Sequence, residues 1–112
     1  MSKKTKISFV LPESLQEEFK QKVLDDGYDS KGKSRWVSES VEQLLKLKSY
    51  PDLVKLNDEM KGFNKLESVV VIKELKDQID SAIVEIRKNF PSIEGVQSRI
   101  FRTAIVQRIL LS

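Results

Sequence analysis

The side chains that could do chemistry in this sequence are hydroxyls, carboxylates and amines. Its 112 residues include no cysteine and no histidine, so thiol nucleophiles, disulfides, the usual zinc sites and histidine acid–base catalysis are excluded together. The carboxylates are scattered among lysines at helix-surface spacing, and the 4 glycines stand singly, which leaves no glycine-rich phosphate loop. We therefore expect no enzyme, no cofactor, no bound metal and no small-molecule substrate.

Composition describes an ordinary globular chain with a slight excess of positive charge. The 20 Lys and Arg residues against 17 Asp and Glu give a net charge of +3, which is compatible with a polyanionic partner but is too small to identify one. A chain of this length is expected to fold as one cooperative unit. It contains no apolar run near the roughly 20 residues that cross a bilayer, and its start lacks the features of a signal peptide, so we expect a cytoplasmic location and no membrane contact.

Residues 6–11 predict a β-strand with one apolar side. Their character alternates with a period of two, which is typical of a half-buried strand. The apolar set is Ile7, Phe9 and Leu11, and the alternating set is Lys6, Ser8 and Val10. Pro12 ends the strand and is tolerated at the start of a helix. That helix is expected to carry an apolar stripe formed by Leu15, Phe19 and Val23.

A second helix is expected after residues 25–33, a segment rich in turn-forming residues. Ser34 is expected to cap this helix, which should end near Lys48. Its apolar side consists of Val37, Val41, Leu44 and Leu45. Trp36 is a single aromatic residue at a helical position, so we expect it to pack in the core or at an interface.

The same order of strand, helix, turn and helix occurs a second time. A strand at residues 68–72 is followed by a helix, a break at residues 89–91 and a last helix. The apolar positions are Leu75, Ile79, Ile83 and Ile86 in the first of these helices and Phe101, Ala104, Ile105 and Ile109 in the second. Ser68 lies 60 positions after Ser8, and Ser98-Arg99 lies 64 positions after Ser34-Arg35, so the second turn is longer by four residues.

The segment between the two copies has a different character. Residues 49–51 break the preceding helix, and Leu53, Leu56 and Met60 recur at helical spacing, which predicts a linker with a short helix. The expected organisation is a first motif at residues 1–48, a linker at 49–65 and a second motif at 66–112, all in one compact unit. A lone strand with two helices leaves strand edges and apolar faces uncovered, so each motif is expected to complete the other.

This repeated order resembles the ribbon-helix-helix family of DNA-binding proteins, exemplified by the Arc and methionine repressors and by small plasmid copy-control repressors. The resemblance covers nearly the whole chain except the linker and rests on pattern more than on identity. It implies a mostly α-helical fold with a two-stranded antiparallel β-ribbon, in which two motifs in one chain form a pseudo-dimer. Such a tandem repeat is similar to accessory proteins of conjugation and DNA transfer.

In this family, alternate ribbon side chains enter the major groove and read base edges. The resemblance assigns this role to Lys6, Ser8 and Val10 in the first strand and to Leu66, Ser68 and Val70 in the second. Lysine can donate to guanine acceptors, serine can donate or accept, and valine offers an apolar surface to a thymine methyl. Phosphate contacts from the N-terminal arm and from the starts of the second helices are implied for Lys4, Lys31, Lys33, Ser34, Arg35, Ser98 and Arg99.

Two registers are open for the second strand. In the first, Glu67 falls at the position that the buried Ile7 occupies in the first strand. A slip of one residue would instead expose Val69 and Val71 and would bury Ser68.

We expect a sequence-specific binder of double-stranded DNA that acts as a transcriptional repressor or as an accessory factor, such as a relaxosome component, in transfer of a plasmid or other mobile element. The alternative is an antitoxin-like protein-interaction module with secondary DNA binding, but no polar tail that could wrap a toxin follows the last apolar helix. The ribbon could close within one chain or between two, and self-association on DNA is compatible with either.

Overall fold

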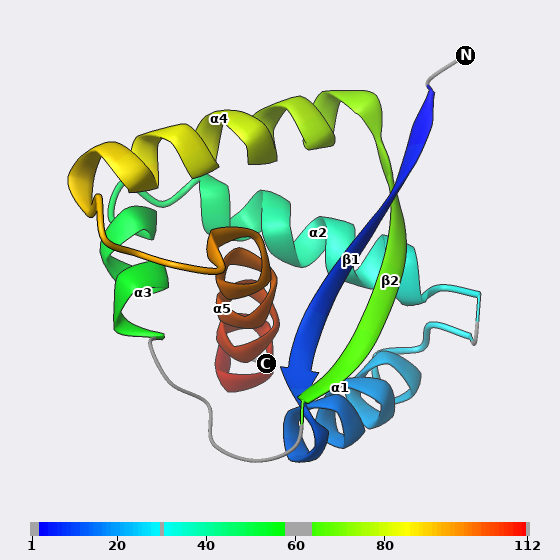
Figure 1. The fold of residues 1–112 in the computed structure, drawn as a ribbon. Coiled ribbons are helices and arrows are strands. Elements are labelled where there is room, and N and C mark those ends of the chain that lie inside the picture. The colour runs from blue at the N-terminus through cyan, green and yellow to red at the C-terminus, as the bar shows by residue number, and fades with distance from the viewer. Residues whose placement is uncertain (1–2, 30, 58–63, 112) are drawn as a thin grey trace.

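The computed structural model describes residues 3–29, 31–57 and 64–111, which form five helices and one two-stranded sheet (Figure 1). In chain order the elements are β1 (Lys4–Pro12), α1 (Glu13–Asp25), α2 (Lys33–Leu45), α3 (Tyr50–Leu56), β2 (Asn64–Ile72), α4 (Lys73–Asn89) and α5 (Val96–Leu111). The expectation of a mostly helical fold with an antiparallel β-ribbon is confirmed. None of the described helices is long and apolar enough to cross a membrane.

The two strands of the ribbon, β1 and β2, pair with each other in antiparallel direction within the same chain. The register places Ser8 opposite Ser68 and Phe9 opposite Glu67. The buried side of the ribbon includes Ile7, Phe9, Leu11, Glu67, Val69 and Val71. Val69 and Val71 are only 1% and 2% exposed, which excludes the one-residue slip of β2.

The helices α1 and α4 each follow a strand directly. Pro12 precedes α1 in an extended conformation, with φ −60° and ψ 145°, and its missing N–H costs no hydrogen bond at a helix start. The buried stripe is Leu15, Phe19 and Val23 in α1 and Leu75, Ile79, Ala82 and Ile86 in α4. Ile83, which the sequence pattern places on the stripe of α4, is half-buried, and Ala82 takes the fully buried position because it lies nearer the centre of that face.

The helices α2 and α5 pack against each other beneath the ribbon, and α2 crosses behind it in Figure 1. Phe9 of β1 stacks on Phe101 of α5, with ring centroids 4.5 Å apart and ring planes inclined by 5°. Phe19 of α1 meets Trp36 of α2 with centroids 5.4 Å apart. All four aromatic side chains are at most 1% exposed, so Trp36 lies in the core as expected, and strand and helices share one core.

The linker contains the expected short helix with different boundaries. α3 begins at Tyr50 and takes Pro51 into its first turn, so the expected break at residues 49–51 is wrong in its last two residues. Val54 is buried, whereas Leu56 is 79% exposed, which corrects the expected apolar stripe. The third residue of that stripe, Met60, lies outside the described residues, and β2 begins within the expected linker.

Candidate nucleic-acid interface

The outward side of the β-ribbon carries the residues that were predicted to face a DNA groove. They are Lys6, Ser8 and Val10 of β1 and Leu66, Ser68 and Val70 of β2. Val10 and Ser68 are half-buried and the other four are exposed, Leu66 to 68%. Lys4 and Ile72, which lie opposite each other, extend this side at one end of the ribbon. The predicted base-reading residues thus share one accessible surface, and their contact with DNA stays a prediction.

Two serines occupy the middle of this surface. Ser8 Oγ and Ser68 Oγ are hydrogen-bonded at 3.0 Å, and the two residues are directly opposite in the strand register. Each hydroxyl can donate one hydrogen bond and accept two, so the pair retains hydrogen-bonding capacity for a ligand. The middle of the surface is therefore polar and uncharged.

Serine hydroxyls at the starts of α2 and α5 hold the two outer edges of the ribbon. Ser34 Oγ accepts a hydrogen bond from the Val70 N–H at 2.9 Å, and Ser98 Oγ accepts one from the Val10 N–H at 3.2 Å. In a two-stranded ribbon these outward amides have no strand partner, so the serines supply the acceptors that the strands cannot. Both serines therefore position the ribbon on the helices.

The expected capping role of Ser34 is wrong. α2 begins one residue earlier, at Lys33, and its N-cap residue is Gly32, with no side-chain capping bond. The Ser34 hydroxyl lies inside the first turn, where it reaches the strand amide instead of an amide of its own helix. α2 also ends at Leu45, before the expected end near Lys48.

Gln97 makes a contact that the sequence analysis did not identify. Its Nε2 donates to the carbonyl oxygen of Ser8 at 2.9 Å, on the same strand as the Val10 N–H that Ser98 accepts. Because Gln97 and Ser8 are 89 positions apart, no local sequence pattern indicates this bond. The start of α5 is thereby attached to β1 at two points.

A hollow of about 580 Å³ lies between the start of α2 and one end of the ribbon, and we call it the α2 hollow. Its lining brings together four of the predicted phosphate contacts, Lys4, Lys31, Ser34 and Arg35. The remaining lining residues are Ser38, Glu39, Glu42, Val70 and Ile72. Three cations stand against two carboxylates, so the lining has an excess of positive charge that would favour an anion.

The loop between α1 and α2, which leads to the α2 hollow, is held by bonds at its start. Gly27 follows the C-cap residue of α1 and has φ 87°, and this left-handed conformation lets the Tyr28 N–H bond the Val23 carbonyl at 3.0 Å. Trp36 Nε1 donates to Asp26 Oδ2 at 2.8 Å. This bond stabilises the carboxylate and is the main cause that lowers the pKa of Asp26.

Tyr28 connects the same loop to α2 and α5. Its hydroxyl donates to Glu39 Oε1 and accepts from Arg108 Nη2 at 3.2 Å. The guanidinium of Arg35 lies over the Tyr28 ring, 4.8 Å from the centroid, where the ring face attracts a cation. Arg35 is exposed, so this stacking orients a predicted phosphate contact without removing it from solvent.

Lys33, another predicted phosphate contact, is paired with Glu67. Its Nζ lies 3.5 Å from Glu67 Oε1, and the two side chains are 35% and 8% exposed. Glu67 occupies a core position of β2, as required by the first of the two registers that the sequence leaves open. Its Oε2 is buried and has no hydrogen-bond partner among the described residues. Lys33 is thus not part of the lining of the α2 hollow. It forms an ion pair with Glu67 on the buried side of the ribbon.

The start of α5 presents less positive charge than the start of α2. Arg99 Nε donates to the Glu94 carbonyl at 2.8 Å, so this guanidinium is directed at the loop before its own helix. Arg99 lines a hollow with Lys55 and the residues of the α4–α5 connection. Arg99 therefore lies apart from the α2 hollow, as the prediction of two separate phosphate contacts requires, and its contact with phosphate stays a prediction.

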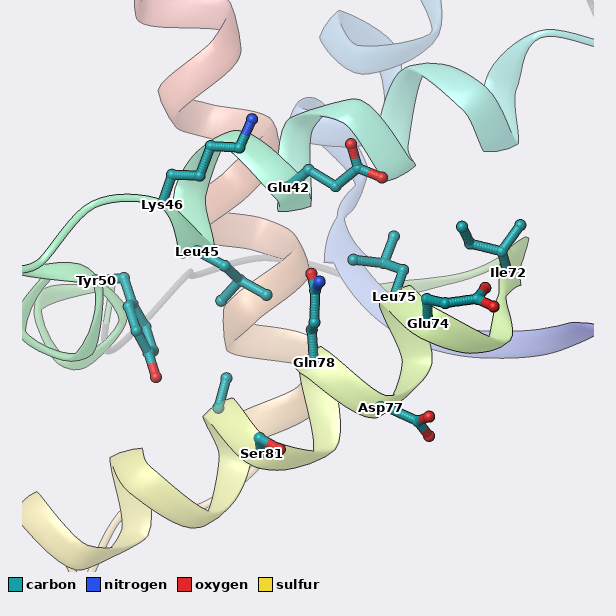
Figure 2. Close-up of a pocket in the computed structure, with 11 residues that line it drawn as sticks. Glu42, Leu45, Lys46, Tyr50, Ile72, Glu74, Leu75, Asp77, Gln78 and Ser81 are labelled. Carbon is teal, nitrogen blue, oxygen red and sulfur yellow. The ribbon is translucent and has the colours of Figure 1, made fainter. Parts of the chain in front are cut away.

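Figure 2 shows another hollow, of about 570 Å³, between α2, α3 and α4, with Gln78 pointing from α4 toward α2. Its charged lining residues are Glu42, Lys46, Glu74 and Asp77. Tyr50, at its edge, donates to Glu85 Oε2 at 2.6 Å, and burial together with this bond raises the pKa of Tyr50 to about 12. Three carboxylates against one lysine make this hollow unsuited to a polyanion.

Residues 3–29, 31–57 and 64–111 contain no group of three or more acidic side chains placed to hold a metal ion. Comparison of the chain with protein-family models, with curated proteins and with solved structures finds no match. The functional interpretation therefore depends on the geometry and chemistry of the ribbon and the helix starts.

Proposed function

We propose that this chain is a tandem ribbon-helix-helix protein that binds double-stranded DNA sequence-specifically, with its β-ribbon in the major groove. In the cell it would act as a transcriptional repressor or as an accessory factor in transfer of a plasmid or other mobile element. The observation that carries this proposal is the accessible outward face of the ribbon, bordered by the cations of the α2 hollow.

The correspondence between the two halves of the chain supports the family assignment. β1, α1 and α2 correspond in order to β2, α4 and α5, with α3 between the two sets. Ser8 and Ser68 meet in the middle of the ribbon. The Ser34 bond to β2 and the Ser98 bond to β1 are equivalent under exchange of the halves. Such a two-fold relation is what a pseudo-dimer of two ribbon-helix-helix motifs requires.

The dimensions of the ribbon suit a major groove. The groove is about 12 Å wide and admits a two-stranded ribbon. From Lys6 to Val10 the chain advances four steps of about 3.3 Å each, or about 13 Å. This length matches about four base pairs at a rise of about 3.4 Å. The outward face could therefore contact a short run of base edges directly.

The chemistry of this surface suits base reading and phosphate binding at different places. Lys6 and the hydroxyls of Ser8 and Ser68 can bond base edges, and Val70 can contact a thymine methyl. Lys31, in the loop before α2, and Arg35, in the first turn of α2, line the hollow beside the ribbon, where a groove-bound duplex would present its phosphates. Phosphate contacts would hold the ribbon in place, and base contacts would provide the specificity.

The test is a selection of bound duplexes from a randomised library, followed by fluorescence-anisotropy titration of an enriched duplex. We expect wild-type affinity for this duplex to exceed that for a scrambled duplex by a factor of about 10³ or more. The Lys6→Ala, Ser8→Ala double variant should lose roughly tenfold or more of the specific affinity. Its free energy of unfolding should equal that of the wild type, because both residues are exposed.

The matched control is Lys88→Ala, which removes the same charge from the end of α4 that lies away from the ribbon in Figure 1. This variant should retain the wild-type affinity within about twofold, because a charge beyond a Debye length of about 10 Å is screened. If the double variant binds the enriched duplex with unchanged affinity and unchanged salt dependence, the ribbon is not the DNA-reading surface.

A further inference from the structure

The backbone of the ribbon is close to two-fold symmetric, but its outward side chains are not. Ser8 and Ser68 mark the centre, and each half of the ribbon is attached to a helix start through one serine hydroxyl. The two halves therefore offer a bound duplex the same backbone frame. Differences in recognition between the halves must come from the side chains that each half displays.

One end of the ribbon is basic and the other is apolar. At the basic end the register pairs Lys6 with Val70 and Lys4 with Ile72, and at the apolar end it pairs Val10 with Leu66. Leu66 is 68% exposed, so its side chain is accessible at the apolar end. On the outward side of the ribbon, Lys4 and Lys6 thus lie on one side of the Ser8–Ser68 centre, and Leu66 lies on the other.

The helix starts strengthen the same asymmetry. Ser34 bonds Val70, so the start of α2, with Lys31 and Arg35, lies at the basic end. Ser98 bonds Val10, so the start of α5 lies at the apolar end. There Gln97 is neutral and bonds the ribbon backbone, and Arg99 bonds the Glu94 carbonyl. Lys6 therefore lies at the end that also carries Lys31 and Arg35, whereas the α5 end carries only Arg99 among the predicted phosphate-binding cations.

We infer that the protein binds a non-palindromic DNA site in a single orientation. This inference rests on the proposed function and names the kind of site. Lys6 at the basic end selects a half-site that contains guanine, because the guanine O6 and N7 atoms accept hydrogen bonds in the major groove. Leu66 and Val10 at the apolar end select an A·T-rich half-site through thymine methyl groups. Turning the molecule around would place a lysine over methyl groups and a leucine over polar base edges.

Two measurements test this inference, and the first is the sequence enriched from the randomised library. The expected consensus has guanine on one side only. Lys6→Ala should relax the preference on the guanine side by roughly tenfold, and Leu66→Ala should relax only the A·T side. A consensus that is palindromic, or variants that each relax both sides, would overturn the inference and leave the proposed function intact.

The second measurement maps orientation directly by cleavage from a tethered iron chelate. The sequence has no cysteine, so a single introduced cysteine is labelled specifically. Glu13→Cys and Lys73→Cys suit this purpose because both positions are exposed, begin the helix after a strand and differ by 60 positions. Lys73 adjoins the basic end of the ribbon, and Glu13 adjoins the apolar end.

For a single orientation, the Lys73→Cys conjugate cleaves beside the guanine half-site and the Glu13→Cys conjugate cleaves beside the A·T half-site. Equal cleavage on both flanks by each conjugate shows binding in two orientations and overturns the inference. A library that yields no enriched sequence and no protein–DNA complex contradicts the proposed function itself. The two failures are therefore distinguishable.

Discussion

Ser34 of α2 accepts a hydrogen bond from the backbone N–H of Val70 in β2 at 2.9 Å, and this bond has a counterpart between α5 and β1. This bond joins the start of α2, which lines the α2 hollow, to β2 of the ribbon. Relative placement of a ribbon and a helix start is what separates base contacts from phosphate contacts in the proposed complex.

Removing either serine hydroxyl should loosen the ribbon. Ser34→Ala and Ser98→Ala are each expected to reduce the free energy of unfolding by about 1 kcal/mol, because a strand amide loses its acceptor. The loss should be larger for Ser98→Ala, since the Val10 amide is part-buried and Val70 is exposed. Urea denaturation measures both values, with the exposed Ser81→Ala on α4 as control. Equal stability of all three variants and wild type would contradict the tethering role.

Replacing Glu67 with a hydrophobic residue should stabilise the protein. Its carboxylate is buried at a core position of β2, with one oxygen near Lys33 and the other without a partner among the described residues. Glu67→Leu removes a desolvated charge and fills the same space, so we expect a gain of about 1 kcal/mol in the free energy of unfolding. The urea midpoint measures this gain. A lower midpoint for Glu67→Leu would mean that the Lys33 ion pair outweighs the cost of burial.

Acid should weaken the connection between Asp26 and Trp36. The pKa of Asp26 is lowered in the folded state, chiefly by the Trp36 bond, so its contribution to stability is present above the unfolded value of 3.8. This contribution is lost as the pH falls through the lower, folded-state value. Asp26→Asn should therefore show less loss of stability than wild type across that acid range. The single tryptophan reports unfolding by fluorescence, and identical acid profiles would contradict the assignment.

At alkaline pH, ionisation of Tyr50 should lower the stability of the folded state. Burial and the Glu85 bond raise its pKa to about 12, above the ordinary value of 10.0. Between these two values the folded state keeps the Tyr50 proton and the unfolded state releases it. The contribution of Tyr50 to the free energy of unfolding is therefore complete below pH 10 and is lost as the pH rises toward 12. The tyrosinate absorbance difference between wild type and Tyr50→Phe measures this pKa. A midpoint near the ordinary value, or one unchanged in Glu85→Gln, would contradict the stated causes.

Local patterns predicted the surfaces of the ribbon well. Alternation of Ile7, Phe9 and Leu11 with Lys6, Ser8 and Val10 identified which side of β1 is buried, because a strand has a period of two. For β2 the period left two registers open, and the structure shows the one that places Glu67 in the core. In α3 the period failed at Leu56, because a helix of 7 residues offers too few turns to define a stripe.

Contacts between distant segments could not be predicted from one sequence. A serine at a helix start normally suggests a cap, and the strand amide that Ser34 binds is 36 positions away. The same limit applies to Lys4 and Lys31, which line one hollow only because the end of the ribbon lies beside the start of α2. The repeated motif predicted phosphate contacts at Arg35 and Arg99, but it could not show that Arg35 stacks on Tyr28 whereas Arg99 bonds the Glu94 carbonyl.

The most direct test of the central claim is methylation interference on an enriched duplex. Dimethyl sulfate methylates guanine N7, which lies in the major groove, and adenine N3, which lies in the minor groove. If the outward face of the ribbon enters the major groove, methylated guanines within about four base pairs should be depleted from bound DNA, and methylated adenines should not. Depletion confined to methylated adenines, with guanine N7 methylation tolerated throughout, would contradict a ribbon in the major groove.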